Sequence, residues 1–261
     1  MRVNIHSSQA GDGPAVILLH GLFGMGSNLA AMSRALQDNY CVYSLDLPNH
    51  GRSGWVQSID TPAMATAILG WMDEQGISIA ALVGHSLGGK VAMTMALQQP
   101  QRVSALVVAD IAPVQYGSGH EREFAALQAV ASAGCQSRKE AHVLMSEYLD
   151  NEAVIQFLLK NLVRQADGCY SWRFNLPGIV AGYGAVRAAV ASTSPYQKPV
   201  LFIKGGDSDY IQEKHRDQIM SLFPQTQLKV MPGCGHWLHV ENPRLFNSLV
   251  GRYLDDQIVD S

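Results

Sequence analysis

A serine between glycines stands directly behind an apolar run and ahead of a helix-like stretch. Residues 84–88 read GHSLG, a GxSxG pattern centred on Ser86, and residues 79–83 read IAALV. A strand that turns sharply into a helix crowds its own backbone, so the flanking residues must be small and the apical side chain projects away from the sheet. Ser86 is therefore a candidate nucleophile, although the pattern alone also fits a serine that only caps a helix.

The candidate base is His236. It lies in the loop-like segment 232–237, PGCGHW, behind the strand-like run at 228–231. A serine hydroxyl is a poor nucleophile until a base removes its proton, and a carboxylate that fixes the tautomer of that base improves it. A serine early in the chain and a histidine late fit the order Ser, Asp, His. A histidine such as His236, taken alone, more often has a packing or surface role, but its pairing with Ser86 favours catalysis.

A second glycine-containing turn follows the first strongly apolar run. Residues 20–24 read HGLFG and end the run AVILL at 15–19. Glycines let backbone amides turn inward, so the N–H of Leu22 can join the N–H of Leu87 as a donor to an oxyanion. Losing one such donor typically costs about 3 kcal/mol of transition-state stabilisation. A plain strand-to-helix turn is the alternative.

Apolar, β-branched runs alternate with helical periodicity along the chain. The predicted buried strands are 15–20, 40–45, 79–84, 103–109, 199–204 and 227–231, with an edge strand near 2–6. This alternation predicts an α/β fold, a mostly parallel twisted sheet with helices on both faces. Ligands bind outside the carboxyl ends of such strands. The candidates expected there are Ser86, Asp110, Leu22 and His236.

One stretch interrupts the alternation. No convincing buried strand is expected between about Pro113 and Tyr196, and helical patterns are predicted at 121–133, 137–149, 152–163 and 178–191. We therefore predict a core of residues 1–112 and 196–261 with an inserted helical cap at 113–195. Four apolar residues of the cap would lie toward the sheet edge or pack against one another: Phe124, Phe157, Leu158 and Trp172.

Composition restricts the partners. Charged residues make up 16% of the 261 residues and the net charge is −3, which favours a small-molecule substrate over a nucleic acid or a membrane. The N-terminus lacks the apolar core of a signal peptide and no apolar run is long enough to span a bilayer, so a cytoplasmic location is expected. The oligomeric state is not predicted. Four scattered cysteines indicate neither a disulfide framework nor a zinc site: Cys41, Cys135, Cys169 and Cys234.

Two other motifs are incomplete. Residues 84–90 also satisfy GxxxxGK, the start of a phosphate-binding loop, but Val91 replaces the Ser or Thr that would hold magnesium. A nucleotide site is not expected, and Lys90 is interpreted as an ordinary helix residue. The segment 236–241 contains two histidines and a glutamate but no HExxH pattern. Neither a metal nor an organic cofactor is expected.

The chain resembles the α/β-hydrolase superfamily over essentially its whole length, and within it the small bacterial esterases of the YbfF type. The segments that carry the resemblance are HGLFGMGSNL at 20–29, LPNHGRS at 47–53, GHSLGGKVAM at 84–93, ADIAPVQY at 109–116, VIQFLLKNLV at 154–163, WRFN at 172–175 and GCGHWLHVENP at 233–243. The resemblance implies a serine esterase whose cap forms the roof of the substrate pocket.

The acid of the site departs from the usual pattern. Most of the superfamily carries it just after the strand that follows the cap, and Ser208 stands in that place here. A hydroxyl cannot offset the charge of an imidazolium as a carboxylate does. Asp110 ends the run at 103–109, beside the strand of Ser86, and the resemblance favours it as the acid, with Ser208 as a second hydrogen-bond partner. Asp207 and Asp209 stay open as alternatives, as does a loop-capping role for Asp110.

The main prediction is a serine hydrolase that cleaves carboxylic esters or acyl thioesters of small to medium acyl groups through an acyl-enzyme. Ser86 would attack, His236 would move the proton and Asp110 would hold His236. A carbon–carbon lyase or hydrolase of the menaquinone-pathway type on the same scaffold is an alternative, and so is a member of the fold that binds its ligand without catalysis.

Overall fold

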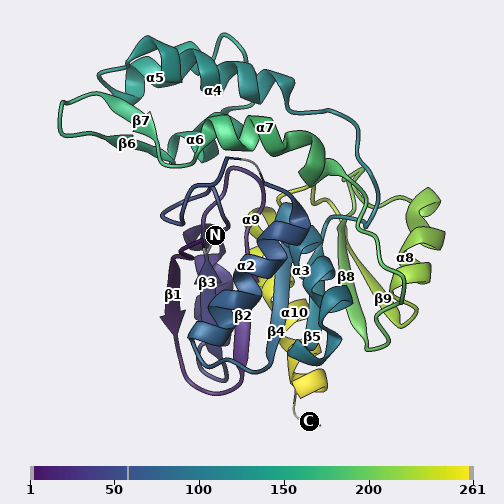
Figure 1. The fold of residues 1–261 in the computed structure, drawn as a ribbon. Coiled ribbons are helices and arrows are strands. Elements are labelled where there is room, and N and C mark those ends of the chain that lie inside the picture. Colours follow the sequence, from purple (N-terminus) through teal and green to yellow (C-terminus); the bar gives the residue numbers. More distant parts are fainter. Residues whose placement is uncertain (1–2, 58, 259–261) are drawn as a thin grey trace.

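A seven-stranded sheet forms the centre of the molecule (Figure 1). The computed structural model describes residues 3–57 and 59–258. The strands are β1 (Ser7–Ala10), β2 (Ala15–Leu19), β3 (Cys41–Leu45), β4 (Ala80–His85), β5 (Val103–Ala109), β8 (Val200–Gly205) and β9 (Thr226–Met231). Their order across the sheet is β1-β3-β2-β4-β5-β8-β9, and only the β1–β3 pair is antiparallel. The six strands predicted as buried all form within one residue of their expected bounds, but the prediction of burial was wrong for β9, which lies at the edge of the sheet and leaves Leu228 and Val230 exposed.

The prediction of an edge strand near residues 2–6 was wrong for residues 3–6, while Met1 and Arg2 lie outside the described residues. The edge strand β1 begins at Ser7, because a tight turn with positive φ at Gly11 and Gly13 folds the residues just before it back beside β3. The preceding residues run past the end of β3. There the carbonyl of His6 accepts a hydrogen bond from the amide of Asp46 at 2.9 Å.

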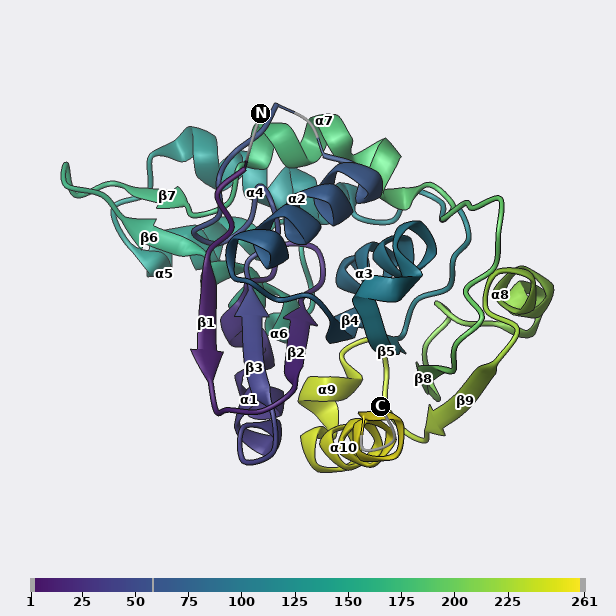
Figure 2. The ribbon, with the colours of Figure 1, turned by 60° about the horizontal axis from the view of Figure 1, so that its bottom comes forward.

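Helices cover both faces of the sheet (Figure 2). The core helices are α1 (Ala30–Leu36), α2 (Thr61–Glu74), α3 (Leu87–Gln98), α8 (Arg216–Leu222), α9 (Leu238–Glu241) and α10 (Pro243–Ile258). Because alternate residues of a strand point to opposite faces, β2 contributes to two apolar clusters. Val16 and Leu18 pack with α1 and α10, while Ile17 and Leu19 pack with α2 and α3.

A second layer lies over the carboxyl ends of the strands, at the top of Figure 1. It contains α4 (Glu121–Ala133), α5 (Arg138–Met145), α6 (Glu152–Leu159), β6 (Leu162–Arg164), β7 (Tyr170–Trp172) and α7 (Leu176–Arg187). The antiparallel pair β6–β7 departs from the all-helical prediction. Each of its strands has three residues, which is too short for a period-2 pattern to be recognised. We call residues 121–186 the cap, and Arg187, the last residue of α7, begins the connection back to the core.

Two asparagines attach the cap to loops of the core. The Nδ2 of Asn175 donates to the Oδ1 of Asn49 at 3.1 Å and to the carbonyl of Val56 at 2.9 Å. The Nδ2 of Asn161 donates to the carbonyl of Phe23 at 2.8 Å. These buried amide N–H groups fix the orientation of one layer against the other, because breaking their bonds would leave the donors unpaired.

The four apolar residues singled out in the cap have structural positions. Leu158 and Trp172 are buried, and the indole N–H of Trp172 donates to the carbonyl of Leu127 at 2.9 Å. Phe124 and Phe157 are half-buried against the same apolar cluster, which continues from the cap into the core. Packing between the layers therefore accounts for these residues.

Candidate active site

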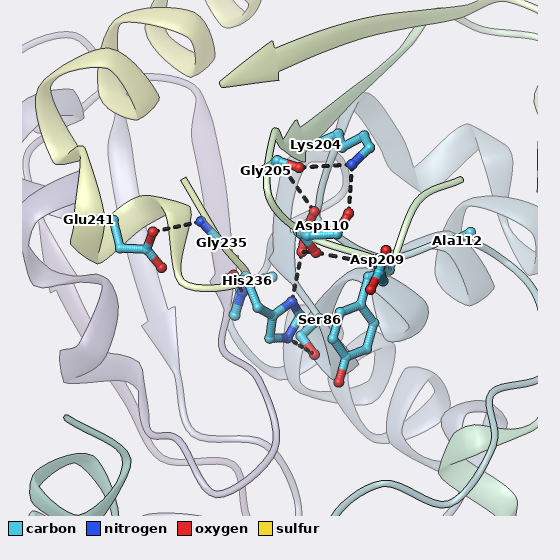
Figure 3. A network of polar contacts seen from close by, with 12 residues as sticks. Ser86, Asp110, Ala112, Lys204, Gly205, Asp209, Gly235, His236 and Glu241 are labelled. Carbon is cyan, nitrogen blue, oxygen red and sulfur yellow. Dashed lines mark hydrogen bonds and ion pairs between the residues drawn. The ribbon is translucent and has the colours of Figure 1, made fainter. Parts of the chain in front are cut away.

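Three side chains from separate loops meet at the carboxyl end of the sheet (Figure 3). Ser86 lies between β4 and α3, Asp110 follows β5, and His236 lies between β9 and α9. The Oγ of Ser86 is 3.0 Å from the Nε2 of His236, and the Nδ1 of His236 is 2.8 Å from the Oδ2 of Asp110. Since a carboxylate only accepts hydrogen bonds, Nδ1 carries the proton and Nε2 is free to accept the proton of the hydroxyl.

The glycines of the GxSxG segment are explained by close backbone contacts. Ser86 has φ 53° and ψ −118°, a conformation that L residues rarely adopt. A Cβ atom on Gly84 would lie 2.3 Å from the carbonyl oxygen of Gly88, and one on Gly88 would lie 2.2 Å from that of Leu19. No larger residue fits at either position without moving backbone, so the two glycines allow α3 to begin directly against β2 and β4.

Asp110 is fully buried, with 0% of its surface exposed, and its carboxylate is hydrogen-bonded on both oxygens. Oδ1 accepts from the amide of Gly205 at 2.9 Å, while Oδ2 accepts from His236 and from the hydroxyl of Ser208. The backbone of Asp110 has φ 51°, and its amide donates to the carbonyl of Ile203 at 2.8 Å. A buried carboxylate needs such donors, because desolvation without them would be costly.

The loop after β8 contributes a hydroxyl and no carboxylate to this group. Ser208 is buried and bonded to Asp110, whereas Asp207 and Asp209 are exposed. Within the described residues neither of these two carboxylates is hydrogen-bonded to His236. Asp209 instead lines the pocket beside Ser86.

Two tyrosines near His236, Tyr210 and Tyr116, were not anticipated from the sequence. The ring of Tyr210 stacks on the ring of His236, with centroids 3.9 Å apart and planes 19° apart. The hydroxyl of Tyr116 donates to the carbonyl of Tyr210 at 2.5 Å and accepts from the amide of Ala112 at 2.8 Å. Both tyrosines lie within three residues of predicted site positions or motifs, but no pattern in the sequence pairs them.

His85, the residue before the serine, also holds the histidine loop. Its Nε2–H donates to the carbonyl of His236 at 2.8 Å, and its ring lies 4.4 Å from the ring of His239. Burial, and after it the neighbouring His239 and His236, keep the pKa of His85 well below its usual range. His85 is therefore neutral at neutral pH and acts as a donor to the loop backbone.

A pocket of about 260 Å³ opens beside the serine. Its lining is mostly apolar or aromatic and includes Leu22, Ser86, Leu87, Lys90, Ile111, Tyr116, His120, Tyr183, Val186, Arg187 and Tyr210. The core supplies one wall, and the cap with its connections supplies the other. Phe124, Phe157, Leu158 and Trp172 are not part of the lining, so other residues of the cap face the pocket.

The amides of Leu22 and Leu87 lie in segments that border this pocket. Leu87 is the first residue of α3, where a helix leaves its N–H groups without an intrahelical partner. The turn that carries Leu22 is held by His20, whose Nδ1–H donates to the carbonyl of Gly21 at 2.7 Å and whose Nε2 accepts from the amide of Leu47 at 3.0 Å. Burial lowers the pKa of His20, in keeping with a neutral ring that has one donor and one acceptor.

Side chains that could bind a metal ion do not cluster in the described part of the chain. No group of three or more His, Cys, Asp or Glu side chains in residues 3–57 and 59–258 is placed to hold a metal ion. In the same residues, none of the helices is both long and apolar enough to cross a membrane.

Residues 14–243 match the α/β-hydrolase fold family, and the chain belongs to that family. The similarity extends to the whole of a curated relative, the esterase YbfF of Escherichia coli, which is 37% identical over 98% of this chain and 100% of its own length. The sn-1-specific diacylglycerol lipase ABHD11 of mouse is 37% identical over 92% of this chain and 81% of its own. A solved structure, a marine microorganism esterase, superposes with a TM-score of 0.94 at 35% identity, covering 97% of this chain and 100% of that one. The protein is thus an α/β hydrolase of the esterase and lipase type.

Proposed function

We propose that this protein cleaves carboxylic esters of small to medium acyl groups through an acyl-enzyme formed on Ser86. The observation that carries the proposal is the continuous chain of contacts from Ser86 through His236 to Asp110. In this mechanism the Oγ of Ser86 attacks the ester carbonyl while its proton passes to the Nε2 of His236. Asp110 keeps the histidine in the required tautomer and stabilises the imidazolium.

The remaining steps use the same residues. The amides of Leu22 and Leu87 would donate to the oxyanion of the tetrahedral intermediate. Its collapse breaks the bond to the leaving group, which takes the proton from His236. Water then attacks the acyl-enzyme with His236 again as the base, and the second collapse releases the acid and restores the Ser86 hydroxyl.

The size of the pocket supports the acyl groups proposed. Drug-sized ligands occupy pockets of about 300–1,000 Å³, and the pocket beside Ser86 is smaller, about 260 Å³. Its apolar lining suits an aliphatic chain. The similarity to a diacylglycerol lipase makes a glycerol ester a useful additional substrate to test. Hydrolysis of acyl thioesters and a cytoplasmic location both stay predictions.

A labelling experiment tests the mechanism. A fluorophosphonate should attach to Ser86 in the folded protein and should fail to attach to Ser86→Ala, which serves as the blank in rate measurements. Nitrophenyl esters of increasing chain length, matched acyl-coenzyme A substrates and a diacylglycerol would define the substrate range. Labelling at another residue, or ester turnover that persists in Ser86→Ala, would contradict the proposal. A labelled serine without any ester or thioester turnover would favour carbon–carbon bond cleavage or ligand binding.

A further inference from the structure

Lys90 is a buried cation that the proposed chemistry does not use. It is the fourth residue of α3 and only 2% of its surface is exposed. Its ammonium donates to three backbone carbonyls, those of Val114 at 3.0 Å, Arg187 at 2.9 Å and Ala188 at 2.5 Å. An ammonium has three N–H donors, so each has an acceptor. Within the described residues it has no carboxylate partner.

The three carbonyls belong to the two segments that join the cap to the core. We call residues 110–120 the first cap connection and residues 187–199 the second. They lie side by side, because the amide of Tyr116 donates to the carbonyl of Arg187 at 3.0 Å and the amide of Val190 donates to the carbonyl of Pro113 at 3.2 Å. Lys90 contacts both connections where they pass each other.

The same connections form part of the pocket wall. Ile111 and residues 116–120 from the first, and Arg187 from the second, line the pocket that contains Ser86, and Lys90 itself borders the same pocket. The amide of Lys90 also donates to the carbonyl of Ser86 at 3.1 Å, so Lys90 stands in the first turn of the helix that begins at the nucleophile. One residue thus links the turn that holds the serine to the backbone that determines the width of the pocket.

We propose that Lys90 is a positioning residue that sets the acyl-chain preference of the pocket by holding both cap connections against α3. The inference rests on the proposed ester hydrolysis. A buried ammonium is stable only while several carbonyl dipoles surround it, so the connections cannot separate from α3 without leaving the charge unsatisfied. Burial, and after it the charge of Arg187, lower the pKa of Lys90 to about 8.

The test compares Lys90→Met with a matched lysine elsewhere. Lys198 is half-buried and its ammonium donates to the carbonyl of Val103 at 2.8 Å, at the end of β5 remote from the cap. Lys198 lies at the core end of the second connection, so Lys198→Met removes a lysine–carbonyl contact away from residues 112–118 and 186–191, where the two connections contact each other and Lys90. Lys90→Arg keeps the charge and the N–H donors. Lys90→Gln, which has a shorter polar side chain, is included as the substitute variant in case Lys90→Met does not fold.

Two readouts are expected to change together. Amide hydrogen exchange in residues 112–118 and 186–191 should accelerate in Lys90→Met or Lys90→Gln and stay unchanged in Lys198→Met. For the preferred nitrophenyl ester, KM should rise roughly tenfold while kcat changes much less. This is the effect expected when a charged hydrogen-bonding group that orders the binding site is lost. The dependence of the hydrolysis rate on acyl-chain length should become flatter. The KM and the exchange rates of Lys90→Arg should lie between those of wild type and Lys90→Met.

The proposal is overturned if Lys90→Met and Lys198→Met have the same exchange rates in both connections, or if the chain-length profile of Lys90→Met matches that of wild type. A parallel loss of kcat on all esters with unchanged exchange would also overturn it. Failure of the proposed function is distinguishable, since wild type would then hydrolyse no ester while the exchange measurement still decides whether Lys90 holds the connections.

Discussion

The hydroxyl of Ser208 donates a hydrogen bond to the Oδ2 of Asp110, the same oxygen that contacts the catalytic histidine candidate. Ser208 follows β8, where most of the family carries its acid, whereas Asp110 follows the neighbouring strand β5. The charge and the supporting hydrogen bond therefore come from two adjacent strands. This division predicts that substitutions at the two positions differ in severity.

Asp110→Asn is expected to reduce kcat by roughly 10³- to 10⁴-fold, because an amide can leave His236 in the wrong tautomer and cannot offset the imidazolium charge. Asp209→Asn, at an exposed position on the pocket rim, should leave kcat nearly unchanged. Steady-state rates on one nitrophenyl ester measure both. The reverse ranking of the two variants would assign the acid to the loop after β8.

Ser208→Ala is expected to be milder. It removes one hydrogen bond to a buried carboxylate while Gly205 and His236 still bond to it. The loss should be roughly tenfold in kcat. A hydrogen bond to a charged group is worth about 1.5–3 kcal/mol, and only part of this free energy is lost from the stabilisation of the transition state. Ser208→Thr keeps the hydroxyl and is the control. A loss in Ser208→Ala as large as that in Asp110→Asn would mean that the serine does more than support the acid.

Gly88→Ala tests the close approach of α3 to β2. Its Cβ would lie 2.2 Å from the carbonyl oxygen of Leu19, and backbone cannot move aside cheaply. Urea unfolding should show a loss of about 3 kcal/mol or more. Gly70→Ala is the matched control, because a Cβ at Gly70 in α2 would meet no atom within 4 Å. That variant should gain about 0.5–1 kcal/mol from helix propensity, and equal effects at the two glycines would contradict the structure.

The burial of His50 predicts that the protein loses stability in acid. It is fully buried with 0% exposure, and burial, with a smaller contribution from His20, lowers its pKa from 6.5 to about 3. Between these two pH values the unfolded chain binds a proton that the folded chain does not, so the free energy of unfolding falls as pH falls through this window. The contribution of His50 should be about 2 kcal/mol between pH 7.5 and pH 5.

Urea unfolding at several pH values measures this dependence. His50→Asn keeps a donor for the carbonyl of Pro48, which the Nδ1–H of His50 contacts at 2.9 Å. The variant should be less stable at pH 7.5 because of the lost ring, yet its free energy of unfolding should fall less steeply toward pH 5. An unchanged slope would show that His50 is protonated in the folded protein or that its pKa is ordinary.

The sheet could be predicted from the sequence because its buried strands are continuous apolar runs between helical segments, as at 103–109, where the expected bounds were those observed. The prediction failed where the pattern carried little information. Residues 3–6, VNIH, are more apolar than β1, SSQA, and the turn at Gly11 and Gly13 determines which residues pair with β3. The β6–β7 hairpin has three residues a strand; the first two residues of β6 fell at the end of the helix predicted at 152–163, and β7 lay between two predicted helices.

The positions of the three candidate residues at one edge of the sheet could be expected from the sequence, and their catalytic roles stay predictions. Ser86 and Asp110 directly follow β4 and β5, and His236 lies in the loop after β9, so the parallel sheet brings the three to one edge. The partners Tyr210 and Lys90 could not be foreseen, because their contacts are made across loops far apart in the chain. Lys90 in particular had been interpreted as an ordinary helix residue, since nothing in a single helix pattern indicates that an insertion packs over it.

The hydrogen bond from Val190 to Pro113 has a consequence for how this architecture can be modified. The chain leaves the sheet and returns to it at two adjacent points, so everything between them can be exchanged without re-routing a strand. Chimeras that graft a foreign insertion between these points would keep the hydrolytic centre intact while presenting it with a differently shaped enclosure. Because the points of departure and return lie side by side, an insertion of a different length could also be accommodated between them.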